Sequence, residues 1–198
     1  MSIQALDVKL FFLINHGTAN WLFDIVMPAL TQRGYLLFLP YIIYISYKGS
    51  QRKDAAGKSY IQPVLWAILI SFCAFPLADW LGNIGKHSIA RVRPCHVLEG
   101  INLLAGCTDS YSMPSNHAVN STAFAVPIFY LTREYIPLTW RLYPLTVAVA
   151  VSFSRVYVGV HYLSDVIAGA LWGGIIAMLL SIVYERIRSE RSISMTEN

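Results

Sequence analysis

The stretch "SRVYVGVHYLSD", residues 154–165, lies between two long apolar segments and carries Arg155, His161 and Asp165 within about three helical turns. The segments on either side are apolar enough to lie in lipid. A charged side chain at the centre of a membrane costs about 3 kcal/mol on insertion scales. The stretch therefore predicts two membrane helices that meet at a polar junction, and the rest of the chain must supply partners for these groups.

The composition is that of an integral membrane protein. Of the 198 residues, 56% are hydrophobic and 13% are charged, and the mean hydropathy is +0.50, whereas about a quarter of the residues in a soluble domain are charged. The N-terminal sequence "MSIQALDVKLFFLINHG" has no basic leader and no small-residue cleavage site, so we expect it to be retained. The 15 Lys and Arg residues lie in short loops and at segment ends, which argues against nucleic-acid binding.

Five segments approach the ~20 apolar residues that a helix needs to cross a membrane. They are residues 31–48, 60–81, 114–131, 142–158 and 161–184. We therefore predict an all-α, polytopic transmembrane helix bundle of about five spans. A single domain, residues 1–198, contains this core at 31–184.

Residues 1–30 are predicted to form helices at the membrane surface. Residues 3–14 are too short to span the membrane, but they place four apolar residues on one helical face, Ile3, Leu6, Leu10 and Leu13. That pattern is typical of an interfacial helix. Residues 20–30 either extend the first span or form a sixth membrane helix.

The basic residues predict the orientation. They gather in the loops 48–58 and 132–141 and in the tail 185–198, and five spans put all three on one side. By the positive-inside rule that side is cytoplasmic, which places a multi-pass protein in the cell (inner) membrane with its C-terminus inside. The connection 82–113 and the turn 154–161 then face outward.

Three polar clusters fall on this outer side: "KHSIARVRP" (86–94), "SMPSNHA" (112–118) and the opening stretch. Pro114, in the second cluster, suits the first turn of a helix. The residues that carry chemistry are Lys86 and Arg93 in the first cluster, Ser115, Asn116 and His117 in the second, and Arg155, His161 and Asp165 in the third.

Together these side chains suit phosphoryl transfer. On a helix His161 and Asp165 share a face, so the carboxylate can accept a hydrogen bond from Nδ1 and leave Nε2 free as a base or nucleophile. His117, at a helix N-terminus, can give a proton to a bound anion. Backbone N–H groups and a set of side chains can hold phosphate, namely Ser115, Lys86, Arg93 and Arg155.

Taken singly, each cluster has a simpler interpretation, as a membrane-interface histidine, a snorkelling base or a helix cap. Asp165 is harder to explain in that way, because a carboxylate about one turn inside an apolar span needs a partner. The presence of all three clusters on one predicted face favours a site.

At these residues the chain resembles the type 2 phosphatidic acid phosphatase superfamily. The signature of that family is K-x6-R-P, then P-S-G-H, then S-R-x5-H-x3-D. The stretches that resemble these three parts, in the same order, are "KHSIARVRP" (86–94), "PSNH" (114–117) and "SRVYVGVHYLSD" (154–165). The resemblance covers about 80 residues of the core. Asn116 stands where the family usually has glycine, so the loss of backbone freedom there leaves open how Asn116 serves phosphate binding.

The resemblance implies a role for each matching residue. His161 would attack phosphorus to form a phosphohistidine, Asp165 would orient and activate it, and His117 would protonate the leaving oxygen. The phosphate oxygens would be held by Lys86, Arg93, Ser115, Asn116 and Arg155. Water would then hydrolyse the phosphoenzyme, with no cofactor and no metal.

The expected substrate is a membrane lipid phosphate whose headgroup protrudes at the outer face. The family suggests undecaprenyl diphosphate, lipid A 1-phosphate, phosphatidylglycerophosphate and phosphatidic acid, and no residue separates them. Two alternatives stay open: a lipid phosphotransferase that uses the same phosphohistidine, and a non-enzymatic lipid-binding or transport protein. The sequence does not indicate an oligomeric state.

Cysteine positions predict a disulfide on the outer side. Cys95 directly follows the "RVRP" stretch and Cys107 precedes "PSNH" by seven residues, so a bridge would close a loop of about a dozen residues between two phosphate-binding motifs. Such a bridge needs an oxidising compartment. Two unpaired thiols are the alternative. Cys73 falls inside the second span as a small apolar residue.

Overall fold

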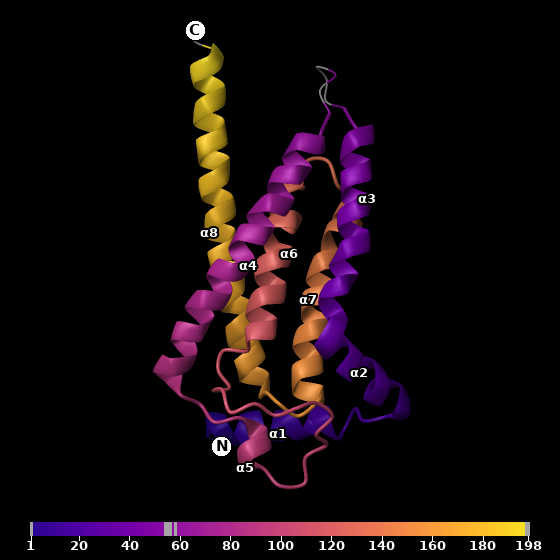
Figure 1. Ribbon diagram of the computed structural model, residues 1–198, viewed down its shortest axis with the longest axis vertical. Coiled ribbons are helices and arrows are strands. Elements are labelled where there is room, and N and C mark those ends of the chain that lie inside the picture. The colour runs from indigo at the N-terminus through magenta and orange to yellow at the C-terminus, as the bar shows by residue number, and fades with distance from the viewer. Residues whose placement is uncertain (1, 54–56, 58, 197–198) are drawn as a thin grey trace.

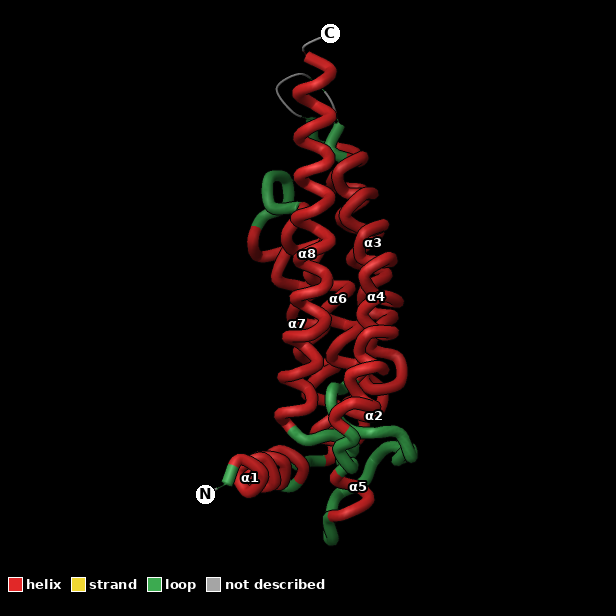
Figure 2. Tube along the Cα trace, turned by 90° about the vertical axis from the view of Figure 1, so that its left-hand side faces the viewer, coloured by secondary structure: helices red, strands yellow, loops and turns green. Residues whose placement is uncertain are grey.

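The computed structural model describes residues 2–53, 57 and 59–196, with side chains as far as Glu190. The described part is helical apart from its loops (Figure 2). In chain order the helices are α1 (Ile3–Asn15), α2 (Trp21–Arg33), the 3-10 helix η1 (Gly34–Leu37), α3 (Phe38–Gln51), α4 (Ile61–Ile89), α5 (Pro94–Val97), α6 (Asn116–Leu131), α7 (Leu138–Tyr157) and α8 (Leu163–Thr196).

Helix α6 forms the centre of the bundle and packs against α4, α7 and α8 (Figure 1). It is apolar around most of its circumference, as expected for a helix surrounded by others. Small residues let α8 approach it closely, because a Cβ at Gly169 or Gly173 would collide with the α6 backbone at Ser115 and Val119. This close packing brings the start of α8 beside the start of α6.

The five predicted spans correspond to η1 with α3, and to α4, α6, α7 and α8. Helices α4 and α8 are each long and apolar enough to cross a membrane by themselves, and the other three lie alongside them (Figure 1). Helix α4 continues eight residues beyond the predicted end of its span, because hydropathy marks where a helix leaves the apolar layer and not where its backbone hydrogen bonds stop. It ends at Ala90, whose φ of 50° is left-handed.

The N-terminal segments fit the prediction of a surface helix. Helix α1 lies across the end of the bundle (Figures 1 and 2), and Ile3 and Leu13 on its outer side are 86% and 62% exposed. Helix α2 continues through η1 into α3 with a change of direction (Figure 1). The segment 20–30 therefore extends the first span as a bent helix.

The three basic segments lie at one end of the bundle, opposite α1 and α5 (Figure 1). Lys58 of the predicted basic loop and residues 197–198 of the predicted tail are outside the described residues. The tail is helical as far as Thr196, as a continuation of α8. The loop 98–115 and the turn between α7 and α8 gather at the opposite end, which is where the polar clusters meet.

Candidate active site

The turn between α7 and α8 sets the position of His161. Gly159 has a φ of 88°, a conformation that favours glycine, and a Cβ there would lie 3.0 Å from the Asn102 carbonyl. His161 precedes the first residue of α8 by two positions, so the expectation that it shares a helical face with Asp165 is wrong. The ring reaches Asp165 because the carboxylate caps the new helix, accepting from Tyr162 N–H at 2.8 Å.

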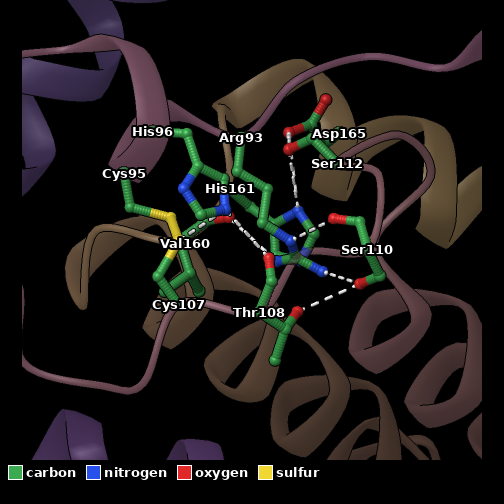
Figure 3. Close-up of a disulfide and its surroundings, with 10 residues drawn as sticks. All are labelled: Arg93, Cys95, His96, Cys107, Thr108, Ser110, Ser112, Val160, His161 and Asp165. Atoms are coloured by element: carbon green, nitrogen blue, oxygen red, sulfur yellow. Dashed lines mark hydrogen bonds and ion pairs between the residues drawn. A yellow bond between two sulfur atoms is a disulfide. The ribbon is translucent and has the colours of Figure 1, made fainter.

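The surroundings of His161 determine its tautomer (Figure 3). Nδ1 lies 3.5 Å from Asp165 Oδ2 and 3.3 Å from Ser112 Oγ, while Arg93 Nη1 lies 3.0 Å from Nε2. Arginine can only donate, so Nε2 must be the acceptor and Nδ1 carries the proton. In this arrangement the ring is therefore neutral, with a lone pair on Nε2.

Arg93 is held by the loop on the other side of the site (Figure 3). Its Nε donates to the Ser110 carbonyl at 2.7 Å and its Nη2 to Ser110 Oγ at 2.9 Å, and its Nη1 also reaches the Val160 carbonyl at 3.1 Å. These contacts fix the guanidinium against Nε2 of His161.

Two further cations, Lys86 and Arg155, lie within range of the charge of Arg93. Lys86, on the last turn of α4, is buried and donates to the Tyr111 carbonyl at 2.8 Å. Arg155 is 8% exposed, and its Nε has no hydrogen-bond partner among the described residues. His117 lies within range of the charges of both, and its ring is 6.0 Å from that of Tyr35. A buried donor without a partner among the described residues is rare in proteins and is available to an anion.

The start of α6 has no side-chain cap. Ser115 is the N-cap residue, but its hydroxyl does not cap the helix and is buried without a partner in the described structure. Its backbone N–H donates to the Asp165 carbonyl at 3.0 Å. Pro114 precedes the helix, joined to Met113 by a cis peptide bond, so the expectation that it lies in the first turn is wrong. An uncapped helix N-terminus favours an anion.

Asn116 has partners of its own. Its Nδ2 donates to Asp79 Oδ1 at 3.0 Å and to Asn83 Oδ1 at 2.9 Å, and Asn120 Nδ2 donates to the same Asp79 oxygen at 2.7 Å. The side chain that replaces the usual glycine therefore ties the start of α6 to α4. Its amide donor is used within the protein.

The structure thus brings the sequence-predicted site residues to one end of the bundle, and it adds three that the sequence analysis missed. Ser112 hydrogen-bonds Asp165 Oδ2 at 2.5 Å, Arg91 Nη1 lies 2.7 Å from Asp165 Oδ1, and Asp7 lies 2.6 Å from Arg91. Ser112 and Arg91 stand inside the quoted clusters, so proximity in sequence could have suggested them. Nothing local to Asp7 indicates its partner.

A disulfide joins Cys95 and Cys107, whose Cα atoms are 6.3 Å apart (Figure 3). His96 Nε2 lies 3.3 Å from Cys107 Sγ, and these three residues are the one cluster of potential metal ligands found among the described side chains. Both sulfur atoms are used by the disulfide bond. The bridge closes the loop 96–106, directly before the segment in which Ser110 and Ser112 contact Arg93 and Asp165.

We expect one free thiol per chain, that of Cys73, in protein denatured without reductant after isolation from its native membrane. Reduction should raise the count to three, because it breaks the bond between Cys95 and Cys107. The bond itself forms only if the loop faces an oxidising compartment. Thiol titration of denatured protein measures both values. Three free thiols before reduction would contradict the bridge. If a membrane-impermeant thiol reagent labels Cys95 or Cys107 of the reduced protein only after the inner face is opened, the predicted outward orientation of this loop is wrong.

Comparisons with known proteins agree with this geometry. Residues 63–189 match the PAP2 superfamily. An undecaprenyl-diphosphatase of Sulfolobus acidocaldarius is 34% identical over 184 residues, 87% of this chain and 76% of that protein. A lipid A 1-phosphatase of Rhizobium etli is 29% identical over 158 residues, 77% of this chain and 66% of that protein.

A solved structure matches over nearly the whole chain. It is the crystal structure of a transmembrane PAP2-type phosphatidylglycerolphosphate phosphatase from Bacillus subtilis, with a TM-score of 0.67 and 25% identity, covering 93% of this chain and 87% of that one. The motifs, the fold and these similarities lead to one conclusion. The chain belongs to the PAP2 superfamily, as a membrane lipid phosphate phosphatase and metal-independent hydrolase.

Proposed function

We propose that this protein removes phosphate from a lipid phosphomonoester or diphosphate at the outer face of the cell membrane, through a phosphohistidine on His161. The observation that carries the proposal is the environment of His161. The neutral ring has Nδ1 toward Asp165 and an Nε2 lone pair aimed at the guanidinium of Arg93, and two buried donors at the same end of the bundle, Ser115 Oγ and Arg155 Nε, have no partner among the described residues.

The reaction then runs in two displacements. Nε2 of His161 attacks phosphorus as the bond from phosphorus to the leaving oxygen breaks, and His117 gives that oxygen a proton. The ring becomes positively charged at this stage, and Asp165 stabilises it through Nδ1–H. Water next attacks the phosphohistidine, with His117 taking its proton, so that phosphate leaves and both histidines return to their starting states.

Phosphate would be held by charge and by the end of a helix. Lys86, Arg93 and Arg155 supply three positive charges, and Ser115 supplies an unpartnered hydroxyl. Asn116 would contribute its backbone N–H at the start of α6, since its side-chain amide donates to Asp79 and Asn83. Positioning and charge stabilisation are the usual basis of phosphoryl-transfer catalysis.

A lipid substrate is supported by where the site lies. It lies at the end of the bundle that helix α1 crosses (Figure 1). The relatives described above are named for three different lipids, so a panel is the decisive experiment. Purified protein should release phosphate from one or more of undecaprenyl diphosphate, lipid A 1-phosphate, phosphatidylglycerophosphate and phosphatidic acid. Release from none of the four would contradict the proposal.

The same panel separates hydrolysis from transfer. Each lipid is tested with and without a second lipid that could accept phosphate. A hydrolase gives equal inorganic phosphate in both arms, whereas a phosphotransferase gives phosphorylated acceptor and correspondingly less inorganic phosphate. Binding without turnover in every arm would instead indicate a lipid-binding or transport protein.

We expect activity to survive excess EDTA and vanadate to inhibit. Three cations in the site neutralise the phosphate, so Mg²⁺ has no charge left to balance, and vanadate adopts the five-coordinate geometry of the transition state. Phosphate release is measured after dialysis against EDTA and again after Mg²⁺ is restored. A complete loss that Mg²⁺ reverses would refute metal independence.

A further inference from the structure

Helix α1 presents a polar residue to the bundle on each side of a buried phenylalanine. Asp7, Phe11 and Asn15 are spaced by four residues and are 5%, 0% and 0% exposed. Asn15 hydrogen-bonds the Tyr157 carbonyl at 2.7 Å and the Asn102 carbonyl at 2.8 Å. The outer side of the same helix is apolar and exposed. The inner side of α1 is thus packed against the end of the bundle that carries the candidate active site.

Asp7 is connected to the site by Arg91. The Arg91 guanidinium places Nη2 2.6 Å from Asp7 Oδ2 and Nη1 2.7 Å from Asp165 Oδ1, and it lies over the ring of Tyr162, 4.0 Å from its centroid. Asp7 also accepts the backbone N–H of Ser164 at 3.0 Å. One guanidinium therefore bridges a carboxylate of α1 and the carboxylate that faces His161.

The two oxygens of Asp165 have separate partners. Oδ2 faces His161, Ser112 Oγ and the N–H of Tyr162, whereas Oδ1 faces Arg91. A guanidinium paired with Asp165 alone would neutralise more of the negative charge of the Asp165 carboxylate, and that carboxylate would then stabilise His161 less. Since Arg91 is shared with Asp7, Asp165 keeps more of its charge for the ring while its orientation stays fixed.

We propose that Asp7 and Arg91 are positioning residues for the His161–Asp165 pair, so that helix α1 is part of the catalytic apparatus and not only a membrane-surface helix. This inference rests on the proposed phosphohistidine mechanism. The stabilisation it concerns develops when His161 gains positive charge, so it acts on the chemical step and leaves substrate binding unchanged.

The test compares Asp7→Asn, Asp7→Glu and Arg91→Lys in the full-length protein, with the lipid that the panel identifies. Asp7→Asn should lower kcat about tenfold with KM within about twofold of wild type, since small displacements of reacting groups cost up to ~10²-fold. The rate of phosphoenzyme formation in a single turnover should fall by the same factor. Asp7→Glu restores the carboxylate and should recover part of kcat, and Arg91→Lys, which cannot bridge both carboxylates, should behave like Asp7→Asn.

The matched control is Glu185→Gln, the same change of carboxylate to amide in the ion pair between Glu185 of α8 and Arg133, which follows α6, at the end of the bundle opposite the site. It should retain wild-type kcat. Wild-type kcat in both Asp7→Asn and Arg91→Lys would overturn the inference. A second outcome would also overturn it: Asp7→Asn lowers kcat, raises KM and lowers Tm, and Asp7→Glu does not restore kcat. Such a defect would reflect only poor docking of α1. If Asp7→Asn does not fold, Arg91→Lys decides.

Different results would contradict the phosphohistidine mechanism and the role of α1. Full activity in His161→Ala would overturn the mechanism and with it the role of α1. An inactive His161→Ala combined with fully active Asp7→Asn and Arg91→Lys would overturn the role of α1 alone.

Discussion

Replacing His161 with alanine is expected to abolish turnover and to leave no phosphoenzyme. The nucleophile is lost, and the described residues place no other imidazole against Asp165. The loss should exceed the ~10²–10³-fold cost of removing one charge-stabilising donor. Phosphate release gives the rate, and an alkaline quench of a single turnover gives the phosphoprotein. Full activity in this variant would refute the phosphohistidine mechanism.

His117→Ala is the matched comparison, because it removes an imidazole from the same site but spares the nucleophile. Its defect lies in protonation of the leaving oxygen. Substrates with a more acidic leaving group should therefore recover much of the rate in His117→Ala and none in His161→Ala. Equal recovery in both variants would show that the two histidines do not have separate roles.

Arg155→Met is expected to lower kcat/KM by ~10²–10³-fold while leaving Tm unchanged or higher. The buried Nε of Arg155 has no partner among the described residues, and its charge lies near that of Arg93. An unsatisfied buried donor costs about 1–3 kcal/mol, so an apolar side chain of similar length relieves that cost. Activity assays and thermal unfolding in detergent measure the two effects.

Arg133→Met provides the control, because Arg133 pairs with Glu185 away from the site and is more exposed. It should retain activity. Arg155→Lys keeps the charge but loses the planar set of donors, so its activity should fall between wild type and Arg155→Met. A fall in Tm as large as that expected for loss of a buried ion pair, with activity retained, would show that Arg155 is structural and does not bind phosphate.

Sequence patterns were enough to predict the features that depend on residues close together in the chain. Runs of apolar residues predicted helices in five segments, and the structure has a helix in each, two of them long and apolar enough to cross a membrane by themselves. The apolar face of residues 3–14 predicted a surface helix, and the structure lays α1 across the bundle end (Figure 2). Residue type and spacing predicted three polar clusters, and the structure brings their residues to one end of the bundle. The ends of helices were less well predicted, since α4 runs on past the apolar layer to Ile89.

The tertiary structure alone decided how the site is held. The sequence placed His161 and Asp165 on one helix, but a turn at Gly159 and a capping carboxylate bring them together instead. The partnership of Asp7 with Ser164 joins residues 157 positions apart. Contacts of that kind leave no periodicity in the chain, because they arise when separately folded helices pack and each buried polar group takes whatever partner the packing brings within reach.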